Sequence, residues 1–378
     1  MESLKDALEK VRKELHKFPE VSEEEYETKK RIQTFLKEHT SCKVVPVAKT
    51  GLLAIFNENE EGKTVMLRAD IDALPIQEVN TFEHKSVNEG ISHKCGHDGH
   101  TTILLGVAKL LTENPLHKRK VLLLFQPSEE NGRGAQFVLE DPSFKELNID
   151  YVFALHNLPG FTKQEIVVKE NEFTSNVKSV VITLEGKTAH AAEPEKGYNP
   201  ANAIAEILHF VKKETKNTPE NPDFFLATPV HIMMGEKAYG VSAGYGEVHL
   251  TLRSWSTRLM KEKQNKFEQL LQKLQEKEKL SINTSWFEEF YANKNNKEAV
   301  EYIKSAAEQL NLSINEINTP FKWGEDFGLF TQQFKGAMFG LGAGKDTPAL
   351  HNPDYDFPDE ITVTGAQLFY NILKEVQQ

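Results

Sequence analysis

The sequence predicts an α/β protein with a second, α+β domain inserted into it. Apolar runs of strand type alternate with helical segments in residues 1–174 and again in residues 290–378, which is typical of a mixed, mainly parallel sheet covered by helices. In residues 175–289 the order becomes strand, helix, two strands, helix and strand, the signature of a small α+β domain. The 378 residues also exceed what one ordinary hydrophobic core supports. We therefore expect one domain from the two outer ranges and a second from the middle range.

Residues 2–38 are expected to form two amphipathic helices, because their apolar side chains recur at helical spacing. Phe18-Pro19-Glu20 breaks the pattern, and Ser22 followed by three glutamates predicts the N-cap and first turn of the second helix. His16 falls in the last turn of the first helix. We interpret it as an ordinary histidine at a helix end.

The remaining elements follow from the same periodicity. Strands of the outer domain are expected at Lys43–Val47, Leu52–Phe56, Thr64–Arg68, Lys120–Phe125, Asp150–Leu155 and Gly336–Gly340. Its further helices are expected at Thr102–Leu111, from near Gly134, at Lys297–Leu310 and from Pro358. The middle domain is expected to contain strands Val177–Glu185, Phe225–Met233, Glu247–Arg253 and Ser281–Trp286, with helices Asn202–Lys212 and Arg258–Gln275.

Composition narrows the classes of partner. The net charge of -11 argues against a nucleic-acid partner, which would require a basic face. No apolar run reaches the length of a membrane span, and the N-terminus lacks the apolar core of a signal peptide. Cys42 and Cys95 are the two cysteines, too few for a disulfide framework. We expect a cytoplasmic protein with no membrane partner.

The segment from His93 to His100, with the sequence HKCGHDGH, is unusually rich in groups that bind metals or transfer protons. It stands directly before the helix expected at Thr102–Leu111. Thiolate and imidazole ligands packed this densely favour a metal site, although a polar loop would have the same composition. Further ligand residues elsewhere in the chain would favour the metal site over the polar loop.

Such partners follow three of the predicted strands. Asp70 comes after the first, Glu129 and Glu130 follow the second, and His156 follows the third. Each alone has an ordinary alternative: a solvated turn, an acidic loop or a structural histidine. The carboxyl ends of parallel strands meet at one edge of a sheet, however, and that edge is where open α/β folds bind ligands. Together these residues favour a site.

The chemistry available to them is amide hydrolysis. Five residues offer nitrogen, oxygen and sulfur ligands, more than one catalytic zinc ion needs, and so suggest two metal ions: Cys95, His97, Glu130, His156 and His351. Glu129 could take a proton from a metal-activated water and return it to the leaving amine. Asp70 could hold a ligand histidine in place or position the metal ions without binding them directly. His190, in the middle domain, could donate to the oxyanion after domain closure or from a second subunit.

With these residues assembled, the chain closely resembles the bacterial and plant N-acyl-amino-acid amidohydrolases. That group includes hippurate hydrolases, N-acetyldiaminopimelate deacetylases and auxin-conjugate hydrolases. It is a branch of the co-catalytic metallopeptidases that also contain aminoacylase and glutamate carboxypeptidase. The resemblance covers nearly the whole chain and rests on the order and spacing of several motifs: residues 12–16 with Pro19-Glu20, 68–75, 95–100, 126–130, 156–160, 186–190, 325–327 and 350–353.

The resemblance implies a zinc-peptidase-like catalytic domain with an inserted lid and dimerisation domain, and a homodimer formed through that lid. It implies the five metal ligands named above, Glu129 as general base, Asp70 as the aspartate of the catalytic motif and His190 as the lid histidine. It also implies two divalent ions per subunit, zinc or manganese, with cobalt or nickel as alternatives. The implied substrate is a small N-acyl amino acid, carrying for example an acetyl or benzoyl group.

Two positions depart from the family pattern. Many relatives carry an Asn-Val-Ile-Pro-like stretch where this chain has Gly240-Val241-Ser242-Ala243-Gly244, and the position of Ser128 is often alanine.

Arg253 is a candidate to bind the substrate carboxylate, with a structural arginine as the alternative. A dipeptidase or aminopeptidase on the same scaffold, and a non-catalytic metal-binding protein, are the alternative functions.

Overall fold

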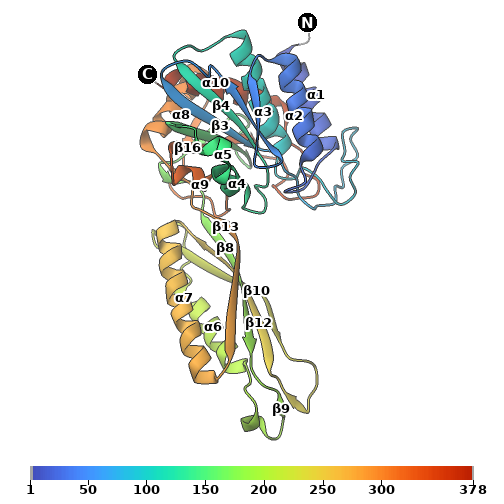
Figure 1. The fold of residues 1–378 in the computed structure, drawn as a ribbon, viewed down its shortest axis with the longest axis vertical. Helices are drawn as coiled ribbons and strands as arrows, with labels where there is room; N and C mark the ends of the chain where they lie inside the picture. Colours follow the sequence, from blue (N-terminus) through green and yellow to red (C-terminus); the bar gives the residue numbers. More distant parts are fainter. Residues whose placement is uncertain (1–2, 377–378) are drawn as a thin grey trace. The chain divides into compact units, whose positions relative to one another are not determined.

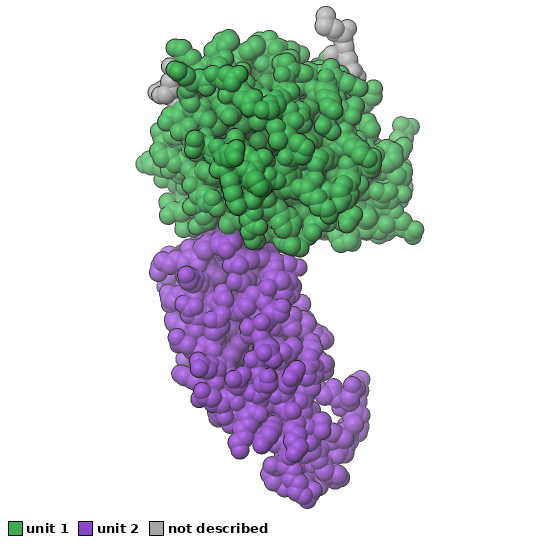
Figure 2. Space-filling view, viewed as in Figure 1, with its two compact units in different colours: residues 1–173, 293–318, 326–378 green, residues 174–292, 319–325 purple. Residues whose placement is uncertain are grey.

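The computed structural model describes residues 3–376. The chain divides into two compact units, coloured separately in Figure 2. Unit 1 contains the residues up to Phe173, Asn293–Asn318 and the residues from Asp326 onwards, and unit 2 contains Thr174–Ala292 and Thr319–Glu325. The α/β class predicted from the sequence is confirmed by the sheet and helices of unit 1.

Unit 1 is built on an eight-stranded mixed sheet in the order β1-β2-β4-β3-β5-β16-β6-β15 (Figure 1). The four strands β4, β3, β5 and β16 run parallel at its centre, and β1 and β2 are antiparallel at one side. The strands are β1 (Lys43–Val47), β2 (Gly51–Phe56), β3 (Lys63–Asp70), β4 (Arg119–Gln126), β5 (Tyr151–Pro159), β6 (Ile166–Val168), β15 (Ile314–Glu316) and β16 (Lys335–Gly344). A short pair, β7 (Asn171–Glu172) with β14 (Lys294–Asn295), completes the strands of this unit.

The central strands contain long apolar runs because both faces of the sheet are covered. All six residues of β2 are buried, as are the last six of β4. The helices of unit 1 are α1 (Leu4–Lys17), α2 (Tyr26–His39), α3 (His97–Glu113), α4 (Gly134–Glu140), α5 (Pro142–Lys145), α8 (Lys297–Gln309), α9 (Gly328–Thr331) and α10 (Thr362–Glu375), with a 3-10 turn at Asp359–Ile361. Helices α1, α3 and α10 pack on one another, and α8 packs on α10.

The starts of α2, α3 and α10 differ from the prediction, and helix α10 begins at Thr362 rather than Pro358 because a 3-10 turn precedes it. Helix α2 begins at Tyr26 with Glu25 as its N-cap, so the expected N-cap at Ser22 is wrong. Val21 instead bridges to Ala73, and the Ser22 hydroxyl donates to the Asp72 carboxylate at 2.7 Å. Helix α3 begins five residues earlier than expected, so the ligand-rich segment enters its first turn. The first residue of the predicted helix pair, Glu2, lies outside the described residues.

Unit 2 is a four-stranded antiparallel sheet, in the order β10-β12-β8-β13, with two helices. Its strands are β8 (Asn176–Glu185), β10 (Phe225–Met234), β12 (Tyr245–Ser254) and β13 (Ser281–Phe290), and its helices are α6 (Ala201–Glu214) and α7 (Thr257–Glu278). A separate small ladder joins β9 (Ala189–His190) to β11 (Val241–Ser242), and a 3-10 turn spans Pro194–Lys196. The helices and strands enclose a second apolar core.

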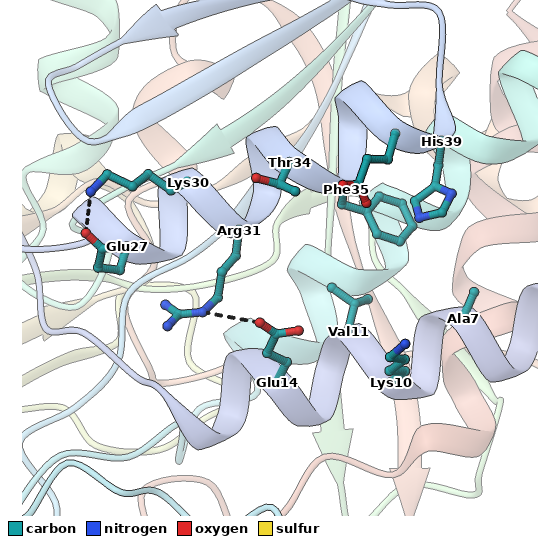
Figure 3. A pocket seen from close by; sticks show the side chains of 11 residues that line it. Ala7, Lys10, Val11, Glu14, Glu27, Lys30, Arg31, Thr34, Phe35 and His39 are labelled. Atoms are coloured by element: carbon teal, nitrogen blue, oxygen red, sulfur yellow. Dashed lines mark hydrogen bonds and ion pairs between the residues drawn. The ribbon is translucent and has the colours of Figure 1, made fainter.

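A surface cavity of about 330 Å³ lies between α1 and α2 in unit 1 (Figure 3). Its lining is mixed in charge: the side chain of Arg31 faces Glu14 with Nε 3.7 Å from Oε1, and Lys30 pairs with Glu27. None of the residues predicted to bind metal or substrate lines this cavity. Among residues 3–376, no helix combines the length and the apolar character needed to cross a membrane.

Candidate metal centre

The predicted ligands gather at the carboxyl edge of the parallel strands in unit 1. A tight turn at Gly96 separates Cys95 from His97, the first residue of α3. Gly96 has a left-handed φ of 96°, and a Cβ there would lie 2.7 Å from the Asn157 side-chain oxygen. Glycine is therefore required at this position, because a side chain would meet both conformational strain and a buried neighbour.

The five predicted ligands form two overlapping groups that share Cys95. The ligand atoms of Cys95, His97 and His156 lie within 4.8 Å of one another, and so do those of Cys95, Glu130 and His351. His156 lies inside β5 rather than after it, with Nε2 3.5 Å from the Cys95 sulfur. Glu130 Oε1 is 3.7 Å from His97 Nε2 and 3.8 Å from His351 Nε2. Two groups with a common thiolate suit a pair of neighbouring cations.

The histidines are oriented so that their Nε2 atoms face the centre of the groups. His97 donates through Nδ1 to the Asp72 carbonyl oxygen at 2.9 Å, and His156 donates through Nδ1 to the Asn157 carbonyl oxygen at 2.9 Å. The buried atoms His97 Nε2 and Glu130 Oε1 make no hydrogen bond. Buried polar atoms are normally paired, so two unpaired ligand atoms facing each other fit a metal ion between them.

The charges around these atoms also favour the binding of cations. Burial, reinforced by the Asp72 and Asp70 carboxylates, raises the pKa of Glu130 to about 7. Burial alone would lower the pKa of His97, but Asp70 and Asp72 outweigh it and raise this pKa to about 10. The carboxylates of Asp70 and Asp72 contribute to both raised pKa values, which shows that negative charge is concentrated here. Bound metal ions would neutralise this charge.

Asp72 has a part in this site that the sequence did not reveal. Its Oδ1 lies 3.3 Å from His97 Nδ1, and its Oδ2 accepts the Glu130 N–H at 3.0 Å. It therefore orients one ligand and holds the backbone of a second. Its place two residues after Asp70, in the same motif, was the available signal. Asp70 itself accepts from Arg68 Nη1 at 2.6 Å and from His100 Nδ1 at 2.7 Å.

Glu129 is buried beside the ligands. Its Oε2 lies 4.0 Å from His97 Nε2, and its Oε1 is 3.4 Å from the backbone N of Asp326. Asp326 is held in turn by Arg68 Nη2 at 2.7 Å and by the Gln126 amide. Neighbouring Glu129 and Glu130 thus both approach His97 Nε2, and they differ in their other neighbours, Asp326 for Glu129 and His351 for Glu130.

His351 is the accessible member of the ligand set. Its side chain is 54% exposed, whereas that of His97 is fully buried. The His351 N–H donates to the carbonyl oxygen of Lys94 at 2.7 Å, which ties its loop to the segment before Cys95. An accessible ligand on one side leaves an approach for a small substrate.

The interpretation of His16 as an ordinary helix-end histidine is wrong. Its side chain is fully buried, with Nδ1 2.8 Å from Asp98 Oδ2 and Nε2 3.1 Å from Glu78 Oε1. Arg12 and Lys94 complete this buried network: Arg12 pairs with Asp98, and the Lys94 Nζ lies 2.6 Å from Glu78 Oε1. The network lies directly behind α3, because Asp98 follows His97. His16 is thus bonded to the residue that follows the predicted ligand His97 in the first turn of α3.

His190 and Arg253 belong to unit 2. His190 is exposed in β9, where its Nδ1 accepts the N–H of Ala192 at 3.1 Å. It pairs with Val241, so the segment Gly240–Gly244, which departs from the family pattern, forms the ladder that carries His190. Arg253 lies in β12 and donates through Nη1 to the carbonyl oxygen of Lys322 at 2.7 Å. Their roles in a site remain predictions.

Known proteins resemble this chain over its full length. The model of peptidase family M20/M25/M40 matches residues 66–375. An N-acetyl-L-cysteine deacetylase of Bacillus subtilis is 31% identical over 97% of this chain and 87% of its own length. A hippurate hydrolase of Campylobacter jejuni is 29% identical over 97% of this chain and 95% of its own length.

A solved structure agrees with these relatives. It is a Bacillus subtilis protein described as a dinuclear metal-binding peptidase of the M20 family, with a TM-score of 0.83 and 26% identity. The match covers 98% of this chain and 97% of that protein. The resemblance to amidohydrolases expected from the sequence is thereby confirmed. The chain belongs to peptidase family M20/M25/M40, and it is a metal-dependent hydrolase of that family's amidohydrolase and deacetylase type.

Proposed function

We propose that this enzyme hydrolyses the amide bond of N-acyl amino acids, giving a carboxylate and a free amino acid. The observation that carries the proposal is the pair of ligand groups sharing Cys95, with Glu129 buried beside them. Three relatives support the substrate class. They are named N-acetyl-L-cysteine deacetylase, hippurate hydrolase and N-acetyldiaminopimelate deacetylase, and each name contains an N-acylated amino acid.

In the proposed mechanism, Cys95, His97, Glu130, His156 and His351 hold two divalent ions. Bound there, the ions would polarise the amide carbonyl and lower the pKa of the attacking water. Glu129 accepts the proton of that water and delivers it to the amide nitrogen as the C–N bond breaks. Asp72 keeps His97 in the tautomer whose Nε2 is available. Thiolate and imidazole ligands favour zinc, with manganese, cobalt and nickel as alternatives.

The proposal gives unit 2 two tasks in binding. His190 donates a hydrogen bond to the oxyanion, and Arg253 binds the carboxylate of the amino-acid product half. Unit 2 also forms a homodimer in this proposal. Strand β10 is at an edge of its sheet and exposes apolar side chains, with Val230 at 65% and Ile232 at 44% exposure, which supports pairing with a second copy.

A panel of N-acetyl and N-benzoyl amino acids, assayed beside unblocked dipeptides with each of the four metals, tests the substrate class. We expect turnover of the acylated amino acids and none of the dipeptides. Turnover of dipeptides alone would assign the enzyme as a dipeptidase. Glu129→Gln is the matched control, expected to keep its metal and to lose roughly 100-fold or more in kcat, the scale of general acid–base catalysis. No turnover of any amide by metal-loaded wild type would refute the proposal.

A further inference from the structure

The loop that carries Glu129 is held on both sides by carboxylates from distant parts of unit 1. On one side, the Ser128 N–H donates to Glu25 Oε1 at 2.7 Å. On the other side, the Glu130 N–H donates to Asp72 Oδ2 at 3.0 Å. Each bond fixes a backbone group next to Glu129. Asp72 also contacts the predicted ligand His97, whereas the Glu25 carboxylate binds Thr50 and Ser128, so the effect of Glu25 on the loop can be tested separately.

Glu25 is itself rigidly held. It is fully buried at the start of α2, and its second oxygen accepts the Thr50 hydroxyl at 2.7 Å. Ser128 Oγ lies 3.3 Å from the Glu25 carboxylate and accepts the Glu23 N–H at 2.9 Å. The segment before α2 therefore forms hydrogen bonds with both the backbone and the side chain of Ser128. An alanine at position 128 would keep only the backbone bond.

These hydrogen bonds matter because the backbone of Ser128 is in an uncommon conformation. Its φ of 58° is left-handed, a region that residues other than glycine seldom adopt. Strained backbone of this kind persists where its surroundings enforce it, commonly at functional sites. The left-handed residue also sets the direction in which the chain enters Glu129. Releasing Ser128 would let this direction change.

A buried carboxylate is a costly way to anchor a helix start. Burial, together with the nearby Asp72, raises the pKa of Glu25 to about 7, so its ionised form is disfavoured in the folded protein. A side chain chosen for stability alone would be neutral here. The hydrogen bond from the Ser128 N–H explains why a carboxylate is present at this position.

From this geometry we infer that Glu25 is a positioning residue for the general base, acting on Glu129 through the Ser128 amide. The inference rests on the proposed function of Glu129. It gives Glu25 a part in the reaction although its carboxylate binds Thr50 and the Ser128 amide. A misplacement of a reacting group by about 1 Å costs on the order of 100-fold in rate, so loss of this anchor is expected to show mainly in kcat.

The test compares variants of Glu25 in metal-loaded enzyme, with kcat expressed per fully loaded site. Glu25→Ala should lower kcat by about 10- to 100-fold, with KM and metal content unchanged. Glu25→Gln keeps an oxygen in reach of the Ser128 N–H and should stay within a few-fold of wild type. Glu25→Asp keeps the charge but is shorter, and should fall between them. Glu24→Ala, at an exposed position in the same segment, is the matched control and should match wild type.

A double variant separates positioning from general stabilisation. If Glu25 acts through Glu129, Glu25→Ala should leave the residual rate of the Glu129→Gln enzyme nearly unchanged, since the group it positions is already lost. Should Glu25→Ala fail to fold, the ranking of Glu25→Gln above Glu25→Asp still tests reach against charge.

Three outcomes would overturn the inference: an unchanged kcat per loaded site in Glu25→Ala, a kcat of Glu25→Asp above that of Glu25→Gln, or an equal further loss in the Glu129→Gln background. Those outcomes leave the proposed function intact as long as wild type hydrolyses N-acyl amino acids and Glu129→Gln does not. Activity retained by Glu129→Gln would instead refute the assignment of the base itself.

Discussion

The buried histidine behind α3 makes stability depend on pH in a defined direction. Burial alone would lower the pKa of His16, but its bonds to Asp98 and Glu78 outweigh burial and raise this pKa to about 9. The folded protein therefore binds this proton more tightly than the unfolded chain, whose histidine has a pKa near 6.5. The resulting stabilisation is complete below about pH 6.5 and is lost as the pH rises through about 9.

The size of this effect follows from the shift. One pKa unit corresponds to about 1.4 kcal/mol, so a rise from 6.5 to about 9 is worth on the order of 3 kcal/mol of unfolding free energy. Between pH 7 and pH 10 the wild type should lose most of this amount. The variant His16→Gln cannot titrate and should be less stable at pH 7, with a flatter profile over the same interval.

Urea unfolding at a series of pH values measures this difference. His39→Gln, an exposed histidine in the last turn of α2, is the control and should follow the wild-type profile. Effects of pH on metal binding are common to all three proteins, so the comparison of slopes isolates His16. Parallel profiles for wild type and His16→Gln between pH 7 and pH 10 would refute the reasoning.

Two substitutions test the site itself. Cys95→Ser removes the thiolate common to both ligand groups. By elemental analysis, the dialysed variant should retain less than one metal ion per chain, and it should lose hydrolytic activity. Full metal content in this variant would show that the sulfur is not shared. Arg68→Met leaves the buried carboxylates of Asp70 and Asp326 without their common cation, so urea unfolding should show a loss of about 3–5 kcal/mol. Arg68→Lys should recover only part of this loss, because one ammonium cannot reproduce the two guanidinium contacts; a Met variant as stable as wild type would contradict the assigned pairing.

Long periodic elements were predictable from the sequence, and short ones were not. In unit 2, the two longest expected strands and the two expected helices match β8, β10, α6 and α7 to within three residues at each end. Strands such as β6 and β15 contain three residues each, which is too short for a period to be visible. They are defined by pairing with strands distant in the sequence, which local composition does not reveal.

Residue types and motif order identified the residues of the candidate metal centre, but they could not say which carboxylate faces which partner. Asp70 and Asp72 stand two residues apart in one motif, yet only Asp72 contacts His97 Nδ1, because β3 ends at Asp70 and the chain turns. His16 and Glu25 were beyond sequence reasoning for the same reason. His16 meets Asp98 and Glu78, and Glu25 meets Ser128, across more than 60 residues of chain, so only the packed core brings them together.

The proposed mechanism requires two divalent ions acting together at the Cys95 centre. Metal-free protein, titrated with Zn²⁺ or Mn²⁺ while hydrolysis of an N-acetyl amino acid is followed, measures how many ions turnover requires. We expect no turnover without metal and a plateau at about two ions per chain. Full turnover at one ion per chain, or turnover without metal, would contradict the two-metal site.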